Sequence, residues 1–529
     1  MEEEDSKHAA AAMHAHARES SLTCISAAVP SCLFHVLYQW RALHIGHAEA
    51  TLLCQAAAAA LQSAVVAGVR VWLQPGVFSA RQCVLHIVSI FMGGCALVSV
   101  AMLPLIRARS GRVLDGKVHA SPNECAAAHP FSRRASAATL PPDVVDAADA
   151  LRRADRSVRS TLCLSHCHAD SVCASGCFFS VVALVVGGLE YPTLWRALQT
   201  EPFSWVVSFI CADSAHALIL AWYILALTLM LYWWPALPSL KGAAPRETSS
   251  ALRRPRVWPS LPRNHANLIL RKGFHALAVC MFTPPIVAGY GVFTALSFAV
   301  AVKAMLLLEL FRALHGVPLS WSRAVHAYFT RYVDDRDSGV FILTNLYLLV
   351  GCALPLWMSL AVAPDPDTPP ATTASVLDAA FPHASALAGV VALGMGDAAA
   401  AVVGILCQRA GVATTWRAVR LTCARGAVRC CARRCGCVQT RTDLLATAHA
   451  SDNKTLQGTG AFVIASMVTH AMAAIAAPRA QHASWTAFST LLGVSALTAG
   501  VETFSQAIDN AVVPPVAWLL ACAARKVCG

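Results

Sequence analysis

Residues 385–407 read SALAGVVALGMGDAAAAVVGILC, and this stretch decides the kind of fold that the chain can adopt. Its only charged residue is Asp397. A helix needs about 20 mostly apolar residues to cross the hydrocarbon core of a bilayer. The stretch therefore predicts a membrane-spanning helix that carries a carboxylate, and a carboxylate placed there without a role costs several kcal/mol.

The composition of the whole chain leads to the same fold class. Of the 529 residues, 57% are hydrophobic and 13% are charged, whereas soluble domains carry about 25% charged residues. One large soluble core does not explain this difference. Burial in a bilayer does, because surfaces that face lipid must be apolar as well as surfaces between helices. We therefore predict an all-α, polytopic integral membrane bundle rather than a soluble multidomain protein.

Further apolar windows suggest about twelve transmembrane helices. The window 205–236 is too long for one straight span and contains Asp213 and His216, so we expect an interfacial piece followed by a span from about 216. The windows are 24–40, 51–73, 83–106, 171–189, 205–236, 274–291, 292–311, 340–362, 385–407, 460–477, 485–505 and 511–525.

The net charge of +12 lies in loops between apolar runs, without the aromatic or basic-stripe pattern of a nucleic-acid-binding protein. Residues 107–160 hold ten Lys and Arg, 238–273 hold eight, 408–450 hold eight, and 363–384 hold none. The positive-inside rule makes the first three loops cytoplasmic and the last lumenal. The predicted spans between these loops agree with that assignment.

These patterns divide the chain into four parts. Residues 1–23 are predicted to be a disordered N-terminus, without the basic region of a cleavable signal peptide. Residues 24–237 form a membrane region with the cytoplasmic loop 107–160. The basic cytoplasmic loop 238–273 precedes a second membrane domain, 274–525, which contains an Arg- and Cys-rich insertion at 409–450.

A helix start in this second domain suits phosphate. Lys454, Thr455, Gly458 and Thr459 stand where the span at 460 begins, so free N–H groups and the positive end of the helix dipole would face the cytoplasm. Glycine allows a phosphate to approach the backbone, and lysine supplies a charge. The alternative is an ordinary capped helix start.

Three carboxylates are expected on the same face of the membrane. Asp337, Asp397 and Asp509 could hold Mg²⁺, which binds through one or two carboxylates plus substrate phosphates, and one of them could instead accept a hydroxyl proton. The alternatives are a solvated loop for the acidic run 334–337, and a structural pairing with a neighbouring helix for Asp397.

The order of the motifs is more specific than any one of them. Arg-Lys-x-Phe-His at 271–275 is followed by Asp-x-Arg-Asp-Ser-Gly at 334–339, Gly-x-Gly-Asp at 394–397, Lys-Thr-x-x-Gly-Thr at 454–459, and Glu502 through Gln506 to Asp509-Asn510. Over residues 268 to about 525 this order resembles the dolichol kinase family.

The resemblance implies a reaction and a set of residues. The reaction is CTP + dolichol → CDP + dolichyl phosphate, with Mg²⁺ or a similar divalent ion, on the cytoplasmic side of the endoplasmic reticulum membrane, and its product serves protein glycosylation. For this reaction, the carboxylates inferred above would be the metal ligands Asp397 and Asp337, and these two with Asp509 are the catalytic candidates. The implied CTP-binding residues are Lys454, Thr455, Gln457, Gly458 and Thr459, although the family usually has Glu at position 457.

Other functions remain open from the sequence. A related phytol or polyprenol kinase, or a CTP-dependent phosphatidate cytidylyltransferase, would share a lysine–glycine segment and acidic residues. A multi-span transporter would instead place polar residues near the midplane and often show repeated halves. The partners that the sequence indicates are a prenol lipid and the membrane; it indicates no nucleic acid and identifies no protein partner.

Overall fold

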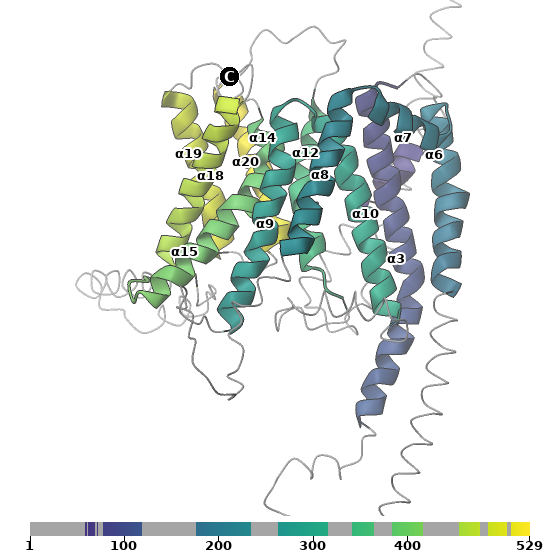
Figure 1. Cartoon of the computed structure of the whole chain (residues 1–529), viewed down its shortest axis with the longest axis horizontal. Coiled ribbons are helices and arrows are strands. Elements are labelled where there is room, and N and C mark those ends of the chain that lie inside the picture. Colours follow the sequence, from purple (N-terminus) through teal and green to yellow (C-terminus); the bar gives the residue numbers. More distant parts are fainter. Residues whose placement is uncertain are drawn as a thin grey trace, which may run out of the picture. The chain divides into compact units, whose positions relative to one another are not determined.

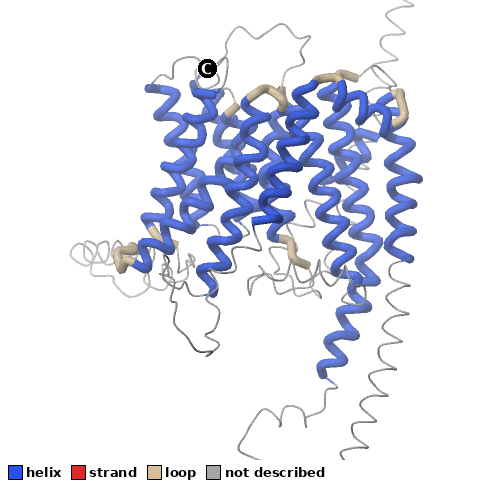
Figure 2. The backbone as a smooth tube through the Cα atoms, in the orientation of Figure 1, coloured by secondary structure: helices blue, strands red, loops and turns tan. Residues whose placement is uncertain are grey.

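The fold is all-helical in the part of the chain that the computed structural model describes. That part consists of residues 59–71 with gaps, 78–118, 176–233, 263–315, 341–363, 383–415, 454–476, 485–504 and 509–528. Within these ranges the regular elements are helices (Figure 2), and an isolated antiparallel bridge joins Thr415 to Thr455. The all-α prediction is confirmed for these residues.

Seven helices of the described part are long and apolar enough to cross a membrane, and a bent pair makes an eighth if it is counted as one span. The prediction of about twelve spans remains a prediction, because the window 24–40 and much of 51–73 lie outside the described residues, as does the N-terminus 1–23. The seven are Ala80–Ile106, Gly176–Leu198, Gly291–Ala313, Thr344–Val362, Ala384–Arg409, Leu456–Ala476 and Trp485–Phe504.

The predicted break in the window 205–236 is confirmed. Helix α7 (Pro202–Cys211) meets α8 (Ser214–Trp233) at an angle of 98°. Asp213 stands at the bend, where its carboxylate accepts a hydrogen bond of 2.9 Å from the N–H of Ala215. An aspartate that caps a helix start in this way explains why the polar residue interrupts the apolar run.

Two helices extend into stretches that the charge pattern assigned to loops. Helix α3 (Ala80–Val118) continues into 107–160, and α9 (Arg263–Val287) begins within 238–273. Arg and Lys are good helix formers, so a charged stretch can continue a helix out of the membrane. Lys272 therefore lies inside a helix. The rest of both loops, and the insertion 409–450 beyond residue 415, lie outside the described residues.

The chain divides into two compact units, and the first comprises Met1–Arg70, Ser89–Thr193 and Lys303–Ile342. Its main polar feature is an ion pair between Glu190, which ends the π-helix η3 (Leu184–Glu190) and precedes α6 (Tyr191–Leu198), and Lys303 on α10 (Gly291–His315). Glu190 is 2% exposed, and Lys303 Nζ lies 4.1 Å from the centre of the Phe91 ring. A Cβ at Gly94 would overlap the Glu190 carboxylate, so this glycine leaves the space for it.

A second buried pair in this unit anchors the chain just before α12 (Thr344–Val362). Glu309 accepts hydrogen bonds from Arg312 at 2.8 and 2.6 Å, and from the backbone N–H of Ile342 at 2.5 Å. Both side chains are buried. The buried carboxylate is therefore fully hydrogen-bonded, as its burial requires.

The second unit comprises Val71–Val88, Leu194–Val302 and Leu343–Gly529. Here α14 (Ala384–Gly389), the π-helix η6 (Val390–Asp397) and α15 (Ala398–Arg409) form one continuous helical rod. The rod packs against α9, α12, α18 (Leu456–Ala476) and α20 (Asp509–Cys528), and α18 also packs against α19 (Trp485–Phe504), as Figure 1 shows. This bundle contains the candidate site.

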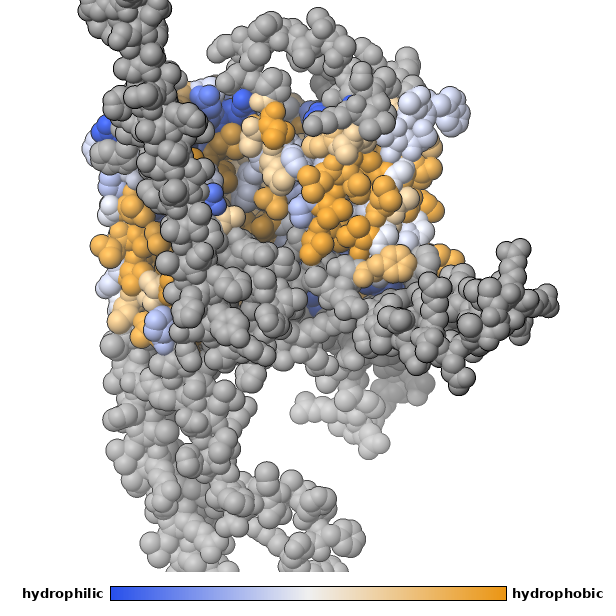
Figure 3. Space-filling view, turned by 180° about the vertical axis from the view of Figure 1, so that it is seen from behind, coloured by the Kyte–Doolittle hydropathy of each residue, from blue (hydrophilic) through white to orange (hydrophobic). Residues whose placement is uncertain are grey.

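The surface of the described helices matches a lipid environment. Figure 3 shows apolar side chains over much of the visible described surface. Individual residues agree: Phe203, Leu184, Ile475 and Trp485 are each more than 70% exposed. Apolar patches of this extent are rare on soluble monomers, so the described helices are those of a membrane protein.

Candidate active site

Asp397 lies at the junction of η6 and α15, where two basic side chains of α9 reach it. Lys272 Nζ is 2.5 Å from Asp397 Oδ2, and His275 Nδ1 is 3.4 Å from the same oxygen. His275 Nδ1 also lies 2.6 Å from the carbonyl oxygen of Leu393. Because a carbonyl oxygen can only accept, we assign the proton to Nδ1. Asp397 and Lys272 are each 13% exposed, so the pair is largely removed from solvent.

The two glycines of the Gly-Met-Gly-Asp motif make this arrangement possible. A Cβ at Gly394 would overlap Val279 of α9, and a Cβ at Gly396 would lie 2.7 Å from the Phe462 ring of α18. The glycines therefore let η6 approach both helices closely, which brings Lys272 and His275 to the carboxylate. A π-helix within an α-helical rod is frequently found at functional sites.

Lys454 reaches the same region from the start of α18. Its ammonium lies 2.8 Å from Glu502 Oε1 on α19 and donates a hydrogen bond to the backbone carbonyl of Glu502. Its charge also acts electrostatically on Asp397. The site thus contains two lysines and two carboxylates, contributed by α9, the segment before α18, the η6–α15 junction and α19.

The start of α18 is capped within the protein. Thr455 Oγ1 accepts a hydrogen bond of 3.1 Å from the N–H of Gly458, which is the bond that an N-cap threonine makes. The N–H of Leu456 donates to the carbonyl of Thr414 at 2.8 Å. The N–H of Thr459 donates to the carbonyl of Thr455 at 3.1 Å, so two of the residues that the sequence suggested for phosphate, Gly458 and Thr459, already have bonded N–H groups. This leaves the Lys454 side chain as the main candidate for a phosphate contact.

Gln457 connects α18 to the segment that follows α15. Its Oε1 accepts from the N–H of Thr414 at 3.0 Å, and its Nε2 donates to the carbonyl of Val412 at 2.9 Å. A glutamine side chain can accept and donate at once, whereas a carboxylate can only accept. The amide at 457, where the family usually has Glu, therefore matches the local backbone of this chain.

We predict that Gln457→Glu lowers stability rather than nucleotide affinity. The carboxylate would lose the bond to Val412, a loss of about 0.5–1.5 kcal/mol, and would face a carbonyl oxygen. Thermal unfolding in detergent should therefore begin at a lower temperature, while the KM for CTP, the nucleotide that the family resemblance implies, should stay within about threefold of wild type, which corresponds to about 0.7 kcal/mol. A large rise in KM at unchanged thermal stability would instead make Gln457 a nucleotide contact.

Gly458 and Thr459 serve helix packing in this structure. A Cβ at Gly458 would lie 2.8 Å from the carbonyl oxygen of Ala400, so the glycine allows α18 to approach α15. The Thr459 hydroxyl lies 2.9 Å from that of Thr503, which joins α18 to α19. Their predicted CTP contacts stay predictions, and these packing roles exist beside them.

Of the three predicted carboxylates, Asp397 has a described side chain and the other two do not. Asp337 lies outside the described residues, and Asp509 opens α20 without a described side chain. Lys272, His275 and Glu502 lie in the motifs that the sequence shows, but they were not predicted as catalytic, metal or nucleotide-binding residues. The spacing of Lys272 and His275 could have identified them, because residues three apart on a helix share one face.

Asp397 suits a magnesium ion of the kind that the family resemblance implies. Among the described residues, no group of three or more His, Cys, Asp or Glu side chains could hold a metal ion. Mg²⁺ does not require one, since it typically binds one or two carboxylates and takes further oxygens from substrate phosphates. Asp397, beside two lysines that can hold phosphate, fits that donor set, and Asp337 remains the second predicted ligand.

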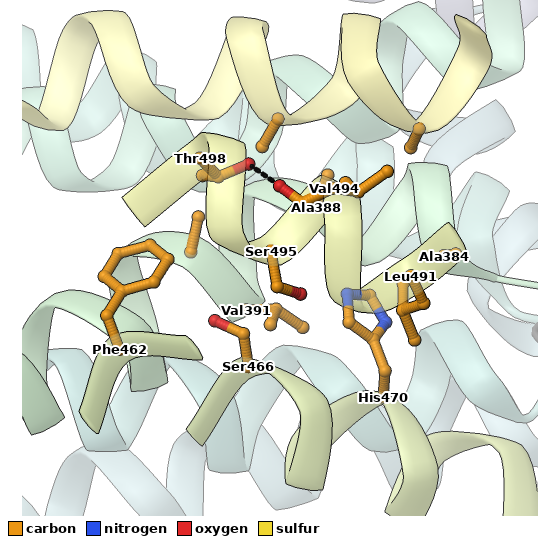
Figure 4. Close-up of a pocket in the computed structure, with 13 residues that line it drawn as sticks. Ala384, Ala388, Val391, Phe462, Ser466, His470, Leu491, Val494, Ser495 and Thr498 are labelled. Carbon is orange, nitrogen blue, oxygen red and sulfur yellow. Dashed lines mark hydrogen bonds between the residues drawn. The ribbon is translucent and has the colours of Figure 1, made fainter. Parts of the chain in front are cut away.

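A cavity inside the same bundle is separate from this charged site. Figure 4 shows Ser466 and His470 of α18 and Ser495 of α19 around it, with Phe462 at one end. Its volume is about 20 Å³, which is room for about one water molecule. It is too small for a nucleotide or a prenol, so the charged cluster is the candidate site for chemistry.

The fold and this cluster define a class: a helical membrane protein with paired lysines and carboxylates enclosed by its helices. The particular relatives are dolichol kinases. The chain is 29% identical to the human dolichol kinase over 232 residues, which are 44% of this chain and 38% of that protein. It is 26% identical to the dolichol kinase EVAN of Arabidopsis thaliana over 346 residues, 65% of this chain and 46% of that protein.

A shorter match agrees with these two. A dolichol kinase of Schizosaccharomyces pombe is 34% identical over 135 residues, which are 25% of this chain and 23% of the relative. The matched regions span less than half the length of each of these curated relatives. No family model and no solved structure matches the chain. The resemblance to the dolichol kinase family that the motifs indicate is confirmed.

Proposed function

We propose that this chain is a CTP-dependent dolichol kinase that transfers the γ-phosphate of CTP to the hydroxyl of dolichol. The observation that carries the proposal is the cluster of Lys272, Asp397, Lys454 and Glu502, which four segments distant in sequence bring into one bundle. The similarity to curated dolichol kinases supports it.

The residues divide the chemistry among them. Lys454 binds and orients the nucleotide phosphates. Asp397, held by Lys272 and His275, accepts or orients the prenol hydroxyl. Asp397, with the predicted ligand Asp337, would hold a divalent ion, which would supply positive charge against the nucleotide phosphates. Phosphoryl transfer depends mostly on such positioning and charge stabilisation, so a site without a covalent nucleophile is sufficient for it.

Product identification tests this function. Purified full-length protein in phosphatidylcholine nanodiscs, given dolichol and CTP, should form dolichyl phosphate and CDP. Phytol and phosphatidate, supplied separately as acceptors, should react far more slowly. Preferential phosphorylation of phytol would support the related phytol kinase, and a CDP-lipid product would support a cytidylyltransferase.

Sidedness gives an independent prediction. If the site faces the cytoplasm, a glycosylation acceptor inserted near Thr372, in the loop 363–384, should be modified by the lumenal machinery. An acceptor inserted near Arg425, in the insertion 409–450, should not. The measurement is the mobility shift of the protein before and after removal of the glycan. The opposite pattern would place Lys454 away from cytosolic CTP and contradict the proposal.

A further inference from the structure

Lys454 is held by Glu502 at two points. The ammonium lies 2.8 Å from the Oε1 atom of Glu502 and donates to the backbone carbonyl of the same residue. The Glu502 side chain is 8% exposed and that of Lys454 is 20% exposed. An ion pair so far removed from water is screened little by salt, so each charge strongly affects what the other can bind.

The position of Glu502 beside Lys454 does not depend on the ion pair alone. The Thr459 and Thr503 hydroxyls lie 2.9 Å apart, and Thr503 Oγ1 also donates to the carbonyl of Ala499 at 2.8 Å. The first contact joins α18 to α19 next to the pair, and the second lies within α19 and fixes the Thr503 side chain. The helices would therefore keep their register if Glu502 lost its charge. Removing the carboxylate would then change what Lys454 can bind and leave the packing as it is.

Each lysine of the cluster has a carboxylate partner before any nucleotide arrives. Asp397 is paired with Lys272, and Glu502 is paired with Lys454. A phosphate that approaches Lys454 therefore meets an ammonium whose charge is already compensated. It must compete with the carboxylate for the ammonium, as any second anion must in a partly buried pair.

We propose that Glu502 is the positioning residue of Lys454, holding its ammonium at the start of α18 as a counterion that a nucleotide phosphate displaces. This inference rests on the proposed function only in the identity of the displacing anion. The pairing itself is a property of the protein without nucleotide. Glu502 thereby limits the affinity for CTP and eases the release of CDP.

The variant Glu502→Gln separates charge from shape. The amide has nearly the same size, and the backbone carbonyl still holds the ammonium. Lys454 therefore keeps this one contact and loses its compensating charge. We expect CTP to bind about tenfold more tightly, which corresponds to about 1.4 kcal/mol, and turnover to fall because CDP leaves more slowly.

The pairing is tested first without nucleotide. Full-length protein in phosphatidylcholine nanodiscs is treated with an amine-reactive reagent, and modification of Lys454 is followed by mass spectrometry. Because the amine must leave Glu502 before it can react, labelling should be several-fold faster in Glu502→Gln. The control Glu201→Gln, which alters the carboxylate that caps α7, should leave the rate unchanged. Equal rates in wild type and Glu502→Gln would overturn the proposal.

Nucleotide binding then tests the counterion effect. CTP affinity is measured for wild type, Glu502→Gln, Lys454→Met and the double variant. The gain from Glu502→Gln should appear with Lys454 present and shrink below about twofold when Lys454 is Met, because contacting charges couple in a double-mutant cycle. Weaker CTP binding in Glu502→Gln, or the same gain in both backgrounds, would contradict the proposal. If wild type binds no CTP but Glu502→Gln still speeds labelling, the pairing stands and the proposed function fails.

Discussion

Replacing Asp397 with asparagine should lower the turnover of dolichol phosphorylation at least about 100-fold, the usual effect of removing a group that acts on the transferred proton or charge. The KM for CTP should change much less, because Lys454 and not Asp397 contacts the phosphates in the proposed site. Asparagine keeps the shape of the side chain but neither neutralises Lys272 nor accepts a proton. Steady-state kinetics on purified protein measures both quantities.

Asp397→Asn leaves Lys272 without its carboxylate partner, and this could lower activity by destabilising the bundle. A double variant separates this loss of stability from a direct effect on the chemistry. Breaking a buried pair by removing one partner costs about 3–5 kcal/mol, whereas replacing both partners by apolar groups is often neutral. Asp397→Asn with Lys272→Met should therefore recover thermal stability without recovering turnover. The matched control Asp213→Asn, at the cap of α8, should be close to wild type because asparagine caps helices equally well. Near-normal turnover in Asp397→Asn would remove this residue from the chemistry.

The second large effect is expected at Glu190. Glu190→Leu leaves the Lys303 ammonium inside the spans Gly176–Leu198 and Gly291–Ala313 without its carboxylate. An uncompensated buried charge should destabilise the protein by about 3–5 kcal/mol. The yield of monodisperse protein and its thermal unfolding temperature in detergent should both fall sharply.

The matching variant removes both charges. Glu190→Leu combined with Lys303→Met should recover most of the stability and retain kinase activity, because we assign this pair to the structure of the first unit. If the double variant folds well but loses activity, the pair has a functional role that we do not assign to it. If it stays as unstable as the single variant, the ion pair does not account for the instability.

The membrane character of the fold could be predicted because it depends on local composition. The apolar windows from 83 onward mostly correspond to described helices, and the break near Asp213 was visible as a polar interruption. Helix ends were less predictable. The charged residues of 107–160 and 238–273 predict loops, yet they continue α3 to Val118 and start α9 at Arg263, because Arg and Lys tolerate a helix well.

A site residue could be predicted from the sequence where placing its side chain in the membrane costs free energy whatever its neighbours are. A carboxylate in an apolar run is expensive, so Asp397 stood out before any contact was known. Its partner Lys272 is 125 residues away in sequence, and such pairings depend on how the helices pack. The role of the Lys-Thr-x-x-Gly-Thr segment, by contrast, could not be predicted from the sequence. A threonine cap and a packing glycine look the same in sequence as a phosphate cradle, and the structure shows that Thr455 and Gly458 have the first two roles.

The position of the label in CTP decides most directly whether this site is that of a dolichol kinase. Purified protein is incubated with dolichol and with CTP labelled either at the γ-phosphate or at the α-phosphate, and the lipid fraction is counted. We predict that label enters dolichol from γ-labelled CTP only, and that Asp397→Asn abolishes most of the transfer. Transfer from α-labelled CTP would mean that the nucleotidyl group moves, and no transfer from either would contradict a CTP-dependent kinase.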